Sequence, residues 1–181
     1  MANAARLFVG LAALLGCMQA AVAAEAPELK VEHSIIIDAT PEEVWAVAGD
    51  FVALDRWLPP IVAGRLILGK NNQVGAIREL TRANGTKVQE KLLEYETSPE
   101  MTMTYTYVGG QVMSTDYFAT ITVSDAGNGQ TRVVWKSRFK RLAYWTDDPP
   151  EGQDDATPVN ALNKVYPLGL QTLKKVVEEA R

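Results

Sequence analysis

Apolar residues recur most regularly near the end of the chain, between Thr157 and Ala180. From Val159 to Val177 an apolar side chain appears every three or four residues, and Asn, Gln, Lys and Glu fill the positions between. This spacing predicts an amphipathic α-helix, roughly 35 Å long at ~1.5 Å per residue. A cap at Thr157 is expected, with a proline in the first turn. The apolar stripe has to be covered by another layer of the protein.

Two residues interrupt this stripe. Pro167 removes one backbone hydrogen bond and predicts a bend in the helix. Gly169 leaves a space on the inner face. A helix that follows a curved sheet and a helix that leaves room for a ligand both explain the interruption, and the pattern alone leaves both open.

Short segments of alternating apolar and polar residues occupy the middle of the chain, as is typical of β-strands. A good helix start, the capping box Thr40-Pro41-Glu42-Glu43, follows the first of them, and a second short helix is expected over residues 51–57. Helices this short do not form a layer, so the strands must cover the long helix. The predicted strands span residues 31–39, 61–68, 76–82, 86–94, 101–108, 116–124 and 131–142.

The hairpin around Ala83-Asn84-Gly85 gives the most informative register. A two-residue Asn-Gly turn would mix polar and apolar side chains on both faces of the hairpin. A three-residue loop with a left-handed glycine pairs Arg82 with Thr86. In this register the polar side chains share one face of the hairpin and most of the apolar side chains share the other. We therefore predict the second register, which places Arg78 opposite Glu90 on the face that covers the helix.

Burying either of these two charges without a partner costs several kcal/mol. Arg78 and Glu90 are therefore expected to pair with each other or to lie in a wet cavity, and the two arrangements are compatible. A position at the edge of the sheet, where both side chains reach solvent, is the alternative.

Aromatic residues are predicted on the same inner face. Threonines alternate with Met and Tyr between residues 101 and 108, which turns Tyr105 and Tyr107 inward. Lys and Arg alternate with apolar residues in the last strand, which turns Trp135, Ser137 and Phe139 inward. Core packing explains this face as well as ligand contact does.

Composition and charge exclude several classes of function. The 181 residues are enough for one domain, and a net charge of −4 gives no sign of nucleic-acid binding. His33 is the only histidine, and no Cys or carboxylate partners stand at ligand spacing, so no metal site is predicted. The few serines lack a histidine partner, and no phosphate-binding loop is present.

The first residues have the pattern of an export signal. An apolar run too short to span a bilayer precedes Ala21-Val22-Ala23, which has the small-x-small form of a signal peptidase site. We expect residues 1–23 to be a signal peptide and residues 24–181 to be the mature domain in the periplasm. A lipoprotein anchored through Cys17, the only cysteine, is the alternative. No other run is long and apolar enough to be predicted as a transmembrane segment.

An acidic loop precedes the final helix, between Tyr144 and Ala156. It has five acids and no basic residue, and its first two residues are aromatic. A solvated loop is one interpretation. A lid or a surface for a protein partner, over Tyr144–Asp155, is the other.

Several segments, in this order and spacing, resemble the START-like/Bet v 1-like superfamily, also called SRPBCC or polyketide cyclase/dehydrase-like. The likeness covers nearly all of the mature chain, and the periplasmic MxaD-like branch associated with methanol oxidation is the most similar. The segments are TPEEVW at Thr40–Trp45, W-x-P at Trp57–Pro59, GAIREL at Gly75–Leu80, VQEKLLEYE at Val88–Glu96, DYFATITV at Asp116–Val123 and GL-x-x-L at Gly169–Leu173.

The resemblance implies an α+β helix-grip fold, in which a seven-stranded curved antiparallel sheet wraps around the C-terminal helix and two short helices follow strand 1. It also implies a hydrophobic cavity between helix and sheet. Members bind lipids, hormones and polyketides, and a minority are cyclases or aromatases. The candidate ligand-binding residues are Trp57, Arg78, Glu90, Tyr105, Tyr107, Tyr117, Trp135, Ser137 and Phe139.

Together these observations predict an exported, non-enzymatic binding or accessory protein for a hydrophobic small molecule. It would assist a periplasmic oxidoreductase such as methanol dehydrogenase. The alternative is a cyclase or aromatase that uses the same cavity, although an ion-paired Glu90 would be a poor general base. No catalytic residue and no cofactor is predicted.

Overall fold

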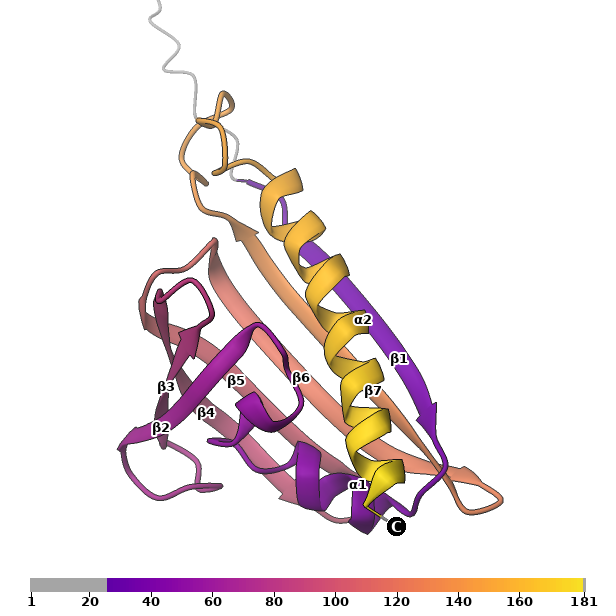
Figure 1. Cartoon of the computed structure of the whole chain (residues 1–181). Coiled ribbons are helices and arrows are strands. Elements are labelled where there is room, and N and C mark those ends of the chain that lie inside the picture. The colour runs from indigo at the N-terminus through magenta and orange to yellow at the C-terminus, as the bar shows by residue number, and fades with distance from the viewer. Residues whose placement is uncertain (1–25, 181) are drawn as a thin grey trace, which may run out of the picture.

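The computed structural model describes residues 26–180 and consists of one curved sheet and one long helix, with a short helix after the first strand (Figure 1). The predicted signal peptide and Cys17 lie outside the described residues. The elements are β1 (Leu29–Ile37), α1 (Pro41–Ala48), the single 3-10 turn η1 (Leu54–Arg56), β2 (Ile61–Leu68), β3 (Ile77–Arg82), β4 (Lys87–Thr97), β5 (Met101–Gly110), β6 (Ser114–Gly127), β7 (Gln130–Arg141) and α2 (Ala156–Glu179).

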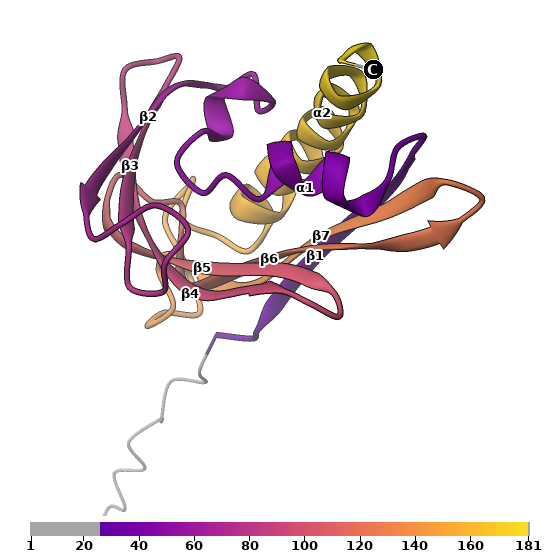
Figure 2. The same cartoon turned by 90° about the horizontal axis from the view of Figure 1, so that it is seen from below.

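The seven strands form one antiparallel sheet in the order β1-β7-β6-β5-β4-β3-β2. Figure 2 shows the sheet curving around α2, which packs against β1 and β7, while α1 lies at one end of the trough. The predicted α+β helix-grip architecture is therefore confirmed. No helix among residues 26–180 is long and apolar enough to cross a membrane.

The capping box at the start of α1 is confirmed, and the second predicted helix is present only as the short 3-10 helix η1. The Thr40 Oγ1 accepts from the Glu43 amide at 3.3 Å, and the Glu43 carboxylate accepts from the Thr40 amide at 2.8 Å. Residues 51–57 contain only η1. The amides of Phe51 and Val52 instead donate to the side chains of Asn72 and Asn71. The first N–H groups of a helix have no partner within the helix, so these two side chains hold the start of the segment in the way that caps do.

The β3–β4 hairpin has the predicted register. The Arg82 amide donates to the Thr86 carbonyl at 2.8 Å, and Gly85 has a φ of +81°. Arg78 is paired with Glu90 across the two strands. The separation of polar and apolar faces therefore identified the correct loop length.

The N-terminus of α2 differs from the prediction. The helix begins at Ala156, so Thr157 lies inside its first turn and is not the cap. The Asp154 carboxylate accepts from both the hydroxyl and the amide of Thr157, each at 2.8 Å. These hydrogen bonds, led by the one from the hydroxyl, lower the pKa of Asp154. The N-cap position is Asp155, whose side chain makes no capping hydrogen bond, and Asp154 just before it accepts from the first turn instead.

The two interruptions of the apolar stripe have different outcomes. The helix continues through Pro167, which lies inside α2. At Gly169 a Cβ atom would lie 2.7 Å from the Leu58 Cδ1 and 3.0 Å from the Trp135 ring. Protein side chains therefore already fill the space that Gly169 leaves, and the glycine serves close packing of α2 on the sheet and not a ligand.

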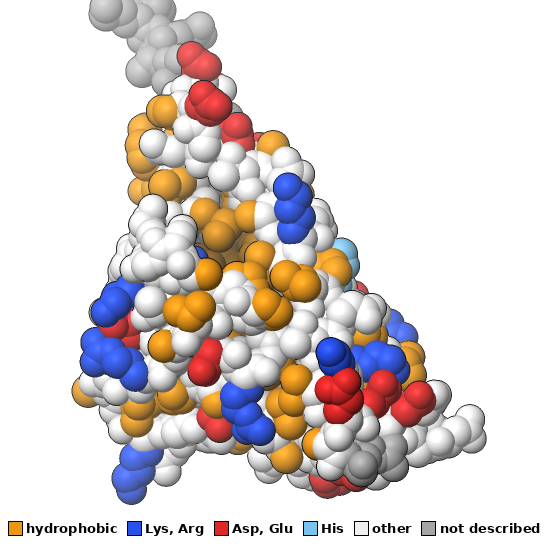
Figure 3. All heavy atoms as spheres, in the orientation of Figure 1, with side chains coloured by type: hydrophobic (Ala, Val, Ile, Leu, Met, Phe, Trp, Pro, Cys, Tyr) orange, Lys and Arg blue, Asp and Glu red, His pale blue; other side chains and the backbone are white. Residues whose placement is uncertain are grey.

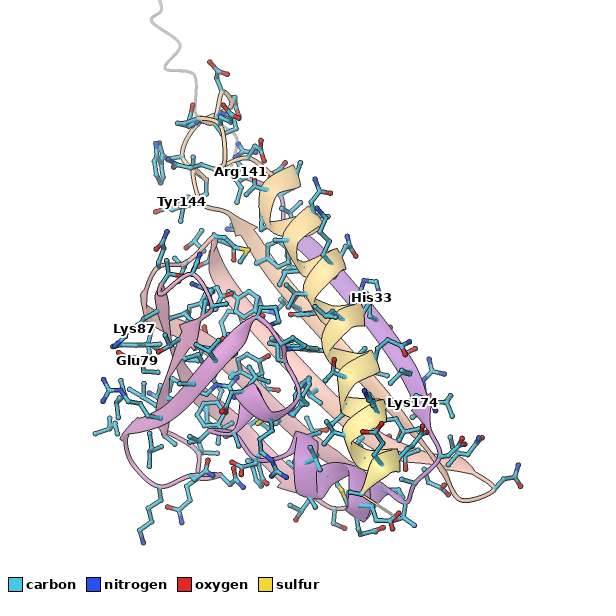
Figure 4. All side chains as sticks on the ribbon, in the orientation of Figure 1. His33, Glu79, Lys87, Arg141, Tyr144 and Lys174 are labelled. Atoms are coloured by element: carbon cyan, nitrogen blue, oxygen red, sulfur yellow. The ribbon has the colours of Figure 1, made fainter. Side chains whose placement is uncertain are left out.

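The convex face of the sheet carries a charged cluster around Glu79 (Figure 4). Its Oε1 lies 2.8 Å from the Arg65 Nη2 and 3.1 Å from the Lys87 Nζ, and Gln89 donates to Oε2. The hydrogen bonds, first the one from Arg65, lower the pKa of Glu79 from 4.5 to about 2. The cluster therefore stabilises the fold above pH 4.5 and loses this effect as the pH falls towards 2.

His33 links the edge of the sheet to the long helix. Its Nε2 lies 2.8 Å from the Asn163 Oδ1, which joins β1 to α2 (Figure 4). In the described part of the chain, no three His, Cys, Asp or Glu side chains are placed to hold a metal ion. The contact of His33 joins two elements of the fold.

Candidate functional site

A cavity of about 170 Å³ lies between the N-terminal half of α2, the η1 region and the inner face of the sheet. Figure 3 shows a hollow with an apolar floor beside α2 on this face of the molecule. Its walls are mainly apolar and aromatic, with Glu90, Arg82 and several tyrosines as the polar groups. The lining residues are Leu54, Leu58, Pro60, Ile61, Leu80, Arg82, Val88, Glu90, Tyr105, Tyr107, Met113, Tyr117, Trp135, Leu162, Val165 and Tyr166.

Arg78 and Glu90 form a buried ion pair at the wall of this cavity. Their exposed fractions are 0% and 5%. The Nε and Nη2 atoms of Arg78 lie 2.7 and 2.6 Å from the same oxygen, Oε2 of Glu90. The third nitrogen, Nη1, donates to the Phe51 carbonyl. The guanidinium also lies over the rings of Phe51 and Tyr105, 4.3 and 4.8 Å from their centroids.

The two members of the pair have different positions relative to the cavity. Arg78 is held behind the wall, whereas Glu90 is one of the lining residues. No donor among residues 26–180 contacts its second oxygen, Oε1. The cavity therefore presents a neutralised carboxylate with one oxygen that can accept a hydrogen bond from a bound molecule.

Stacked and hydrogen-bonded aromatic rings form the opposite wall. Trp135 stacks on Tyr166 at 4.0 Å between ring centroids, and its Nε1 donates to the Tyr105 hydroxyl at 3.1 Å. The hydroxyls of Tyr117 and Tyr166 lie 2.9 Å apart. Each of these hydrogen bonds connects two different elements, so the rings are fixed in place.

Burial determines the chemistry of these tyrosines. It raises the pKa of Tyr105, Tyr117 and Tyr166 above the ordinary value of 10.0. Their hydroxyls therefore stay protonated at neutral pH, and they act as neutral donors and acceptors. Groups of this kind can orient a ligand, but they do not supply a general base near neutral pH.

The structure brings five of the nine predicted site residues together at the cavity: Glu90, Tyr105, Tyr107, Tyr117 and Trp135. Trp57, Arg78, Ser137 and Phe139 are buried behind this wall. Trp57 packs edge-on against Trp135, with 5.3 Å between the ring centroids. The predicted role of all nine as ligand contacts stays a prediction.

Sequence reasoning missed the lining residues that α2 contributes. Leu162, Val165 and Tyr166 face the cavity, but in the sequence they belong to one uniform apolar stripe. A tyrosine within such a stripe was the available signal, because a buried hydroxyl needs a partner on another element.

The loop between β7 and α2 is anchored by one arginine (Figure 4). The buried Arg141 donates to the carbonyls of Ala143 and Thr146 at 3.0 and 2.5 Å and pairs with Asp155 at 3.2 Å. Between the two carbonyls that Arg141 holds, Tyr144 and Trp145 are 45% and 61% exposed. The loop is therefore closed at its neck and presents two aromatic side chains to solvent, as compact Ω-loops often do.

A family model agrees with this architecture over nearly the whole described chain. The model described as polyketide cyclase/dehydrase and lipid transport matches residues 28–178. The chain belongs to this family. It is thereby a member of the SRPBCC, or Bet v 1-like, superfamily. A search of curated protein sequences found no match.

Solved structures of the same fold support the assignment. XoxI from Bacillus cereus is 25% identical, with a TM-score of 0.67 over 83% of this chain and 96% of that one. A protein from Thermobifida fusca is 26% identical, with a TM-score of 0.65 over 83% and 93%. The Zhui aromatase/cyclase from Streptomyces sp. R1128 has a TM-score of 0.70 over 84% and 94%, but at 14% identity it shows only the shared fold.

Proposed function

We propose that this family member is an exported, non-enzymatic protein that binds a hydrophobic small molecule in the cavity between α2 and the sheet. The observation that carries the proposal is the apolar and aromatic cavity with a single neutralised carboxylate at its wall. Pockets that bind small molecules are typically apolar with a few placed polar groups. The family's description, which includes lipid transport, agrees with such a role.

The finer part of the proposal is a periplasmic accessory role for an oxidoreductase such as methanol dehydrogenase. It is supported by the export signal predicted in residues 1–23 and by the resemblance to the MxaD-like branch, together with the similarity to XoxI. Native mass spectrometry of protein purified from periplasm tests two parts of it together. The expected species begins at residue 24 and carries a small molecule. A mass corresponding to lipidated Cys17 would overturn the soluble periplasmic form, and a bare domain would count against the carrier role.

Replacing Glu90 with glutamine separates a binder from an enzyme. In a binder, Glu90→Gln weakens affinity for a bound hydroxyl compound about tenfold, because a charged acceptor becomes a neutral one. The affinity for 1-hexanol is measured by the change in tryptophan emission on titration, since Trp135 lines the cavity. Glu96→Gln, at an exposed position of the same strand, is the matched control and should leave affinity unchanged.

The alternative function, a cyclase or aromatase that uses the same cavity, shares the fold of the Zhui aromatase/cyclase. It requires a poised acid or base, whereas the carboxylate is paired with Arg78 and the lining tyrosines stay protonated. Turnover of an aromatic polyketide that is lost in Glu90→Gln and retained in Glu96→Gln would establish the enzyme and contradict the binding proposal.

The loop Tyr144–Asp155 is the surface that we assign to the protein partner. Exposed Trp and Tyr side chains are frequent anchors in interfaces, and the acids around them favour a basic partner surface. In the accessory role, Trp145→Ala weakens binding to purified methanol dehydrogenase at least about tenfold in surface plasmon resonance. Leu68→Ala, at an exposed position on β2, is the control. Equal binding by both variants would exclude this loop as the contact.

A further inference from the structure

Strands β5 and β6 separate at one end of the sheet. Their pairing runs from Met101–Val123 to Thr106–Phe118 and ends there. Beyond this point β5 stays paired with β4, as far as Gly110, and β6 stays with β7, as far as Ser114, after an irregularity at residues 116 and 117. Two neighbouring strands that follow different partners leave an opening in the sheet.

This opening is an outer cleft of about 390 Å³, lined by Thr106, Tyr107, Gly109, Gly110, Val112, Ser114, Thr115, Asp116, Tyr117, Phe118 and Leu142. Polar side chains are more frequent here than in the inner cavity. Ser114 is only 1% exposed, and its Oγ has no hydrogen-bond partner in the described chain. A buried hydroxyl without a partner is unfavourable, which indicates a place for a polar atom of a bound molecule.

Two tyrosines line both the outer cleft and the inner cavity. The rings of Tyr107 and Tyr117 are stacked in parallel, with 4.0 Å between centroids and 8° between planes. The partition between the two spaces is therefore formed by this stacked pair. Opening the partition requires the movement of a side chain and no change in the sheet.

Tyr107 is the less firmly held member of the pair, because its ring and its hydroxyl both contact Tyr117 and, within the described chain, it has no link to α2 like that of Tyr117. Tyr117 is held at both ends, because its hydroxyl bonds to Tyr166 and its carbonyl accepts from the Thr106 hydroxyl at 2.6 Å. Tyr107 lies beside a bulge in the β4–β5 ladder and keeps part of its surface in solvent. Bulges commonly redirect a side chain next to a functional site.

The volumes agree with a joint site. The inner cavity alone, at about 170 Å³, is smaller than the ~300–1,000 Å³ of typical ligand pockets. The cavity and the cleft together have about 560 Å³, which lies within that range.

We propose that the inner cavity and the outer cleft are two compartments of one binding site, with Tyr107 as the movable partition. Its ligand is an elongated, largely apolar molecule that passes between the compartments and places a polar group beside Ser114. The inference rests on the proposed small-molecule function and adds the shape of the ligand and its route through the sheet.

Straight-chain alcohols of different length test this arrangement. Wild-type protein should bind 1-decanol at least about tenfold more tightly than 1-hexanol, since the additional methylene groups are buried in the second compartment. Tyr107→Trp enlarges the side chain of the partition. It should weaken the binding of 1-decanol about tenfold, while the affinity for 1-hexanol changes less than about threefold. Leu68→Trp, at an exposed position on β2, is the control and should bind both alcohols as the wild type does.

Photolabelling of the wild-type protein gives a second measurement that does not depend on a variant. Two 1-decanol probes carry a diazirine near the first or the last carbon, and labelled peptides are identified by mass spectrometry. One probe should label residues 114–116 in the cleft, and the other should label the inner wall at residues 162–166.

The outcomes separate the two proposals. If 1-hexanol binds but 1-decanol gains nothing, or if both probes label only residues 162–166, the two-compartment site is wrong and the small-molecule function stands. If neither alcohol binds to the folded protein, the proposed function fails, and the inference fails with it.

Discussion

Replacing Arg78 with methionine is expected to destabilise the protein by about 3–5 kcal/mol. The substitution keeps an apolar stem of similar length but leaves the carboxylate of Glu90 buried and unpaired. It also removes the donor to the Phe51 carbonyl, which ties the segment after α1 to the sheet. Urea unfolding at neutral pH, followed by circular dichroism, measures the free energy of unfolding.

The double variant Arg78→Met/Glu90→Leu is the control for this effect. It removes both charges, and well-packed apolar replacements of buried ion pairs are often neutral or stabilising. The double variant should therefore recover most of the lost stability. A loss of less than about 1 kcal/mol in Arg78→Met alone would show that water reaches Glu90 freely, and the cavity wall described above would be wrong.

Replacing Trp135 with alanine is expected to cost about 3–5 kcal/mol, the usual range for a large buried aromatic residue. Trp135 stacks on Tyr166, packs edge-on against Trp57 and donates to the Tyr105 hydroxyl. Removing it breaks the link between α2 and the sheet at the point where Gly169 allows close approach. Thermal unfolding followed by calorimetry measures the change.

Two further tryptophan variants show whether burial causes this loss. Trp145→Ala, on the exposed loop, should change stability by less than about 0.5 kcal/mol. Trp135→Phe should lose less than the alanine variant, because an aromatic ring is kept and only the hydrogen bond to Tyr105 and part of the packing volume are lost. Equal losses in Trp135→Ala and Trp145→Ala would contradict the packing described here.

The sequence was most informative where one face of the sheet is buried. The alternation of polar and apolar residues over 76–94 determined the register of the β3–β4 hairpin. A shift by one residue would place Arg78 and Glu90 on different faces of the sheet. Local capping was less predictable. Thr157 and Asp154 are both good caps, and only the path of the preceding loop decides between them.

The candidate site was predictable only in part. Glu90 and four aromatic residues at the cavity follow from alternation in the strands. The contribution of α2 could not be predicted, because the residues on its inner face form one apolar stripe in which the sequence does not distinguish cavity-lining residues from packed ones. The outer cleft could not be predicted either, because it depends on where the pairing of β5 with β6 ends while each strand stays paired with its other neighbour.

The guanidinium of Arg141, at the neck of the β7–α2 loop, connects the backbone of this loop to the start of α2. Arg141 holds the backbone behind the exposed aromatic pair and also Asp155, the residue from which α2 starts. A molecule that pulls on this loop therefore pulls on the first turn of the helix as well. Leu162, less than two turns further on, forms part of the wall that encloses the hollow. Contact with the aromatic pair would thus act on the cavity wall through Arg141 and the first turns of α2.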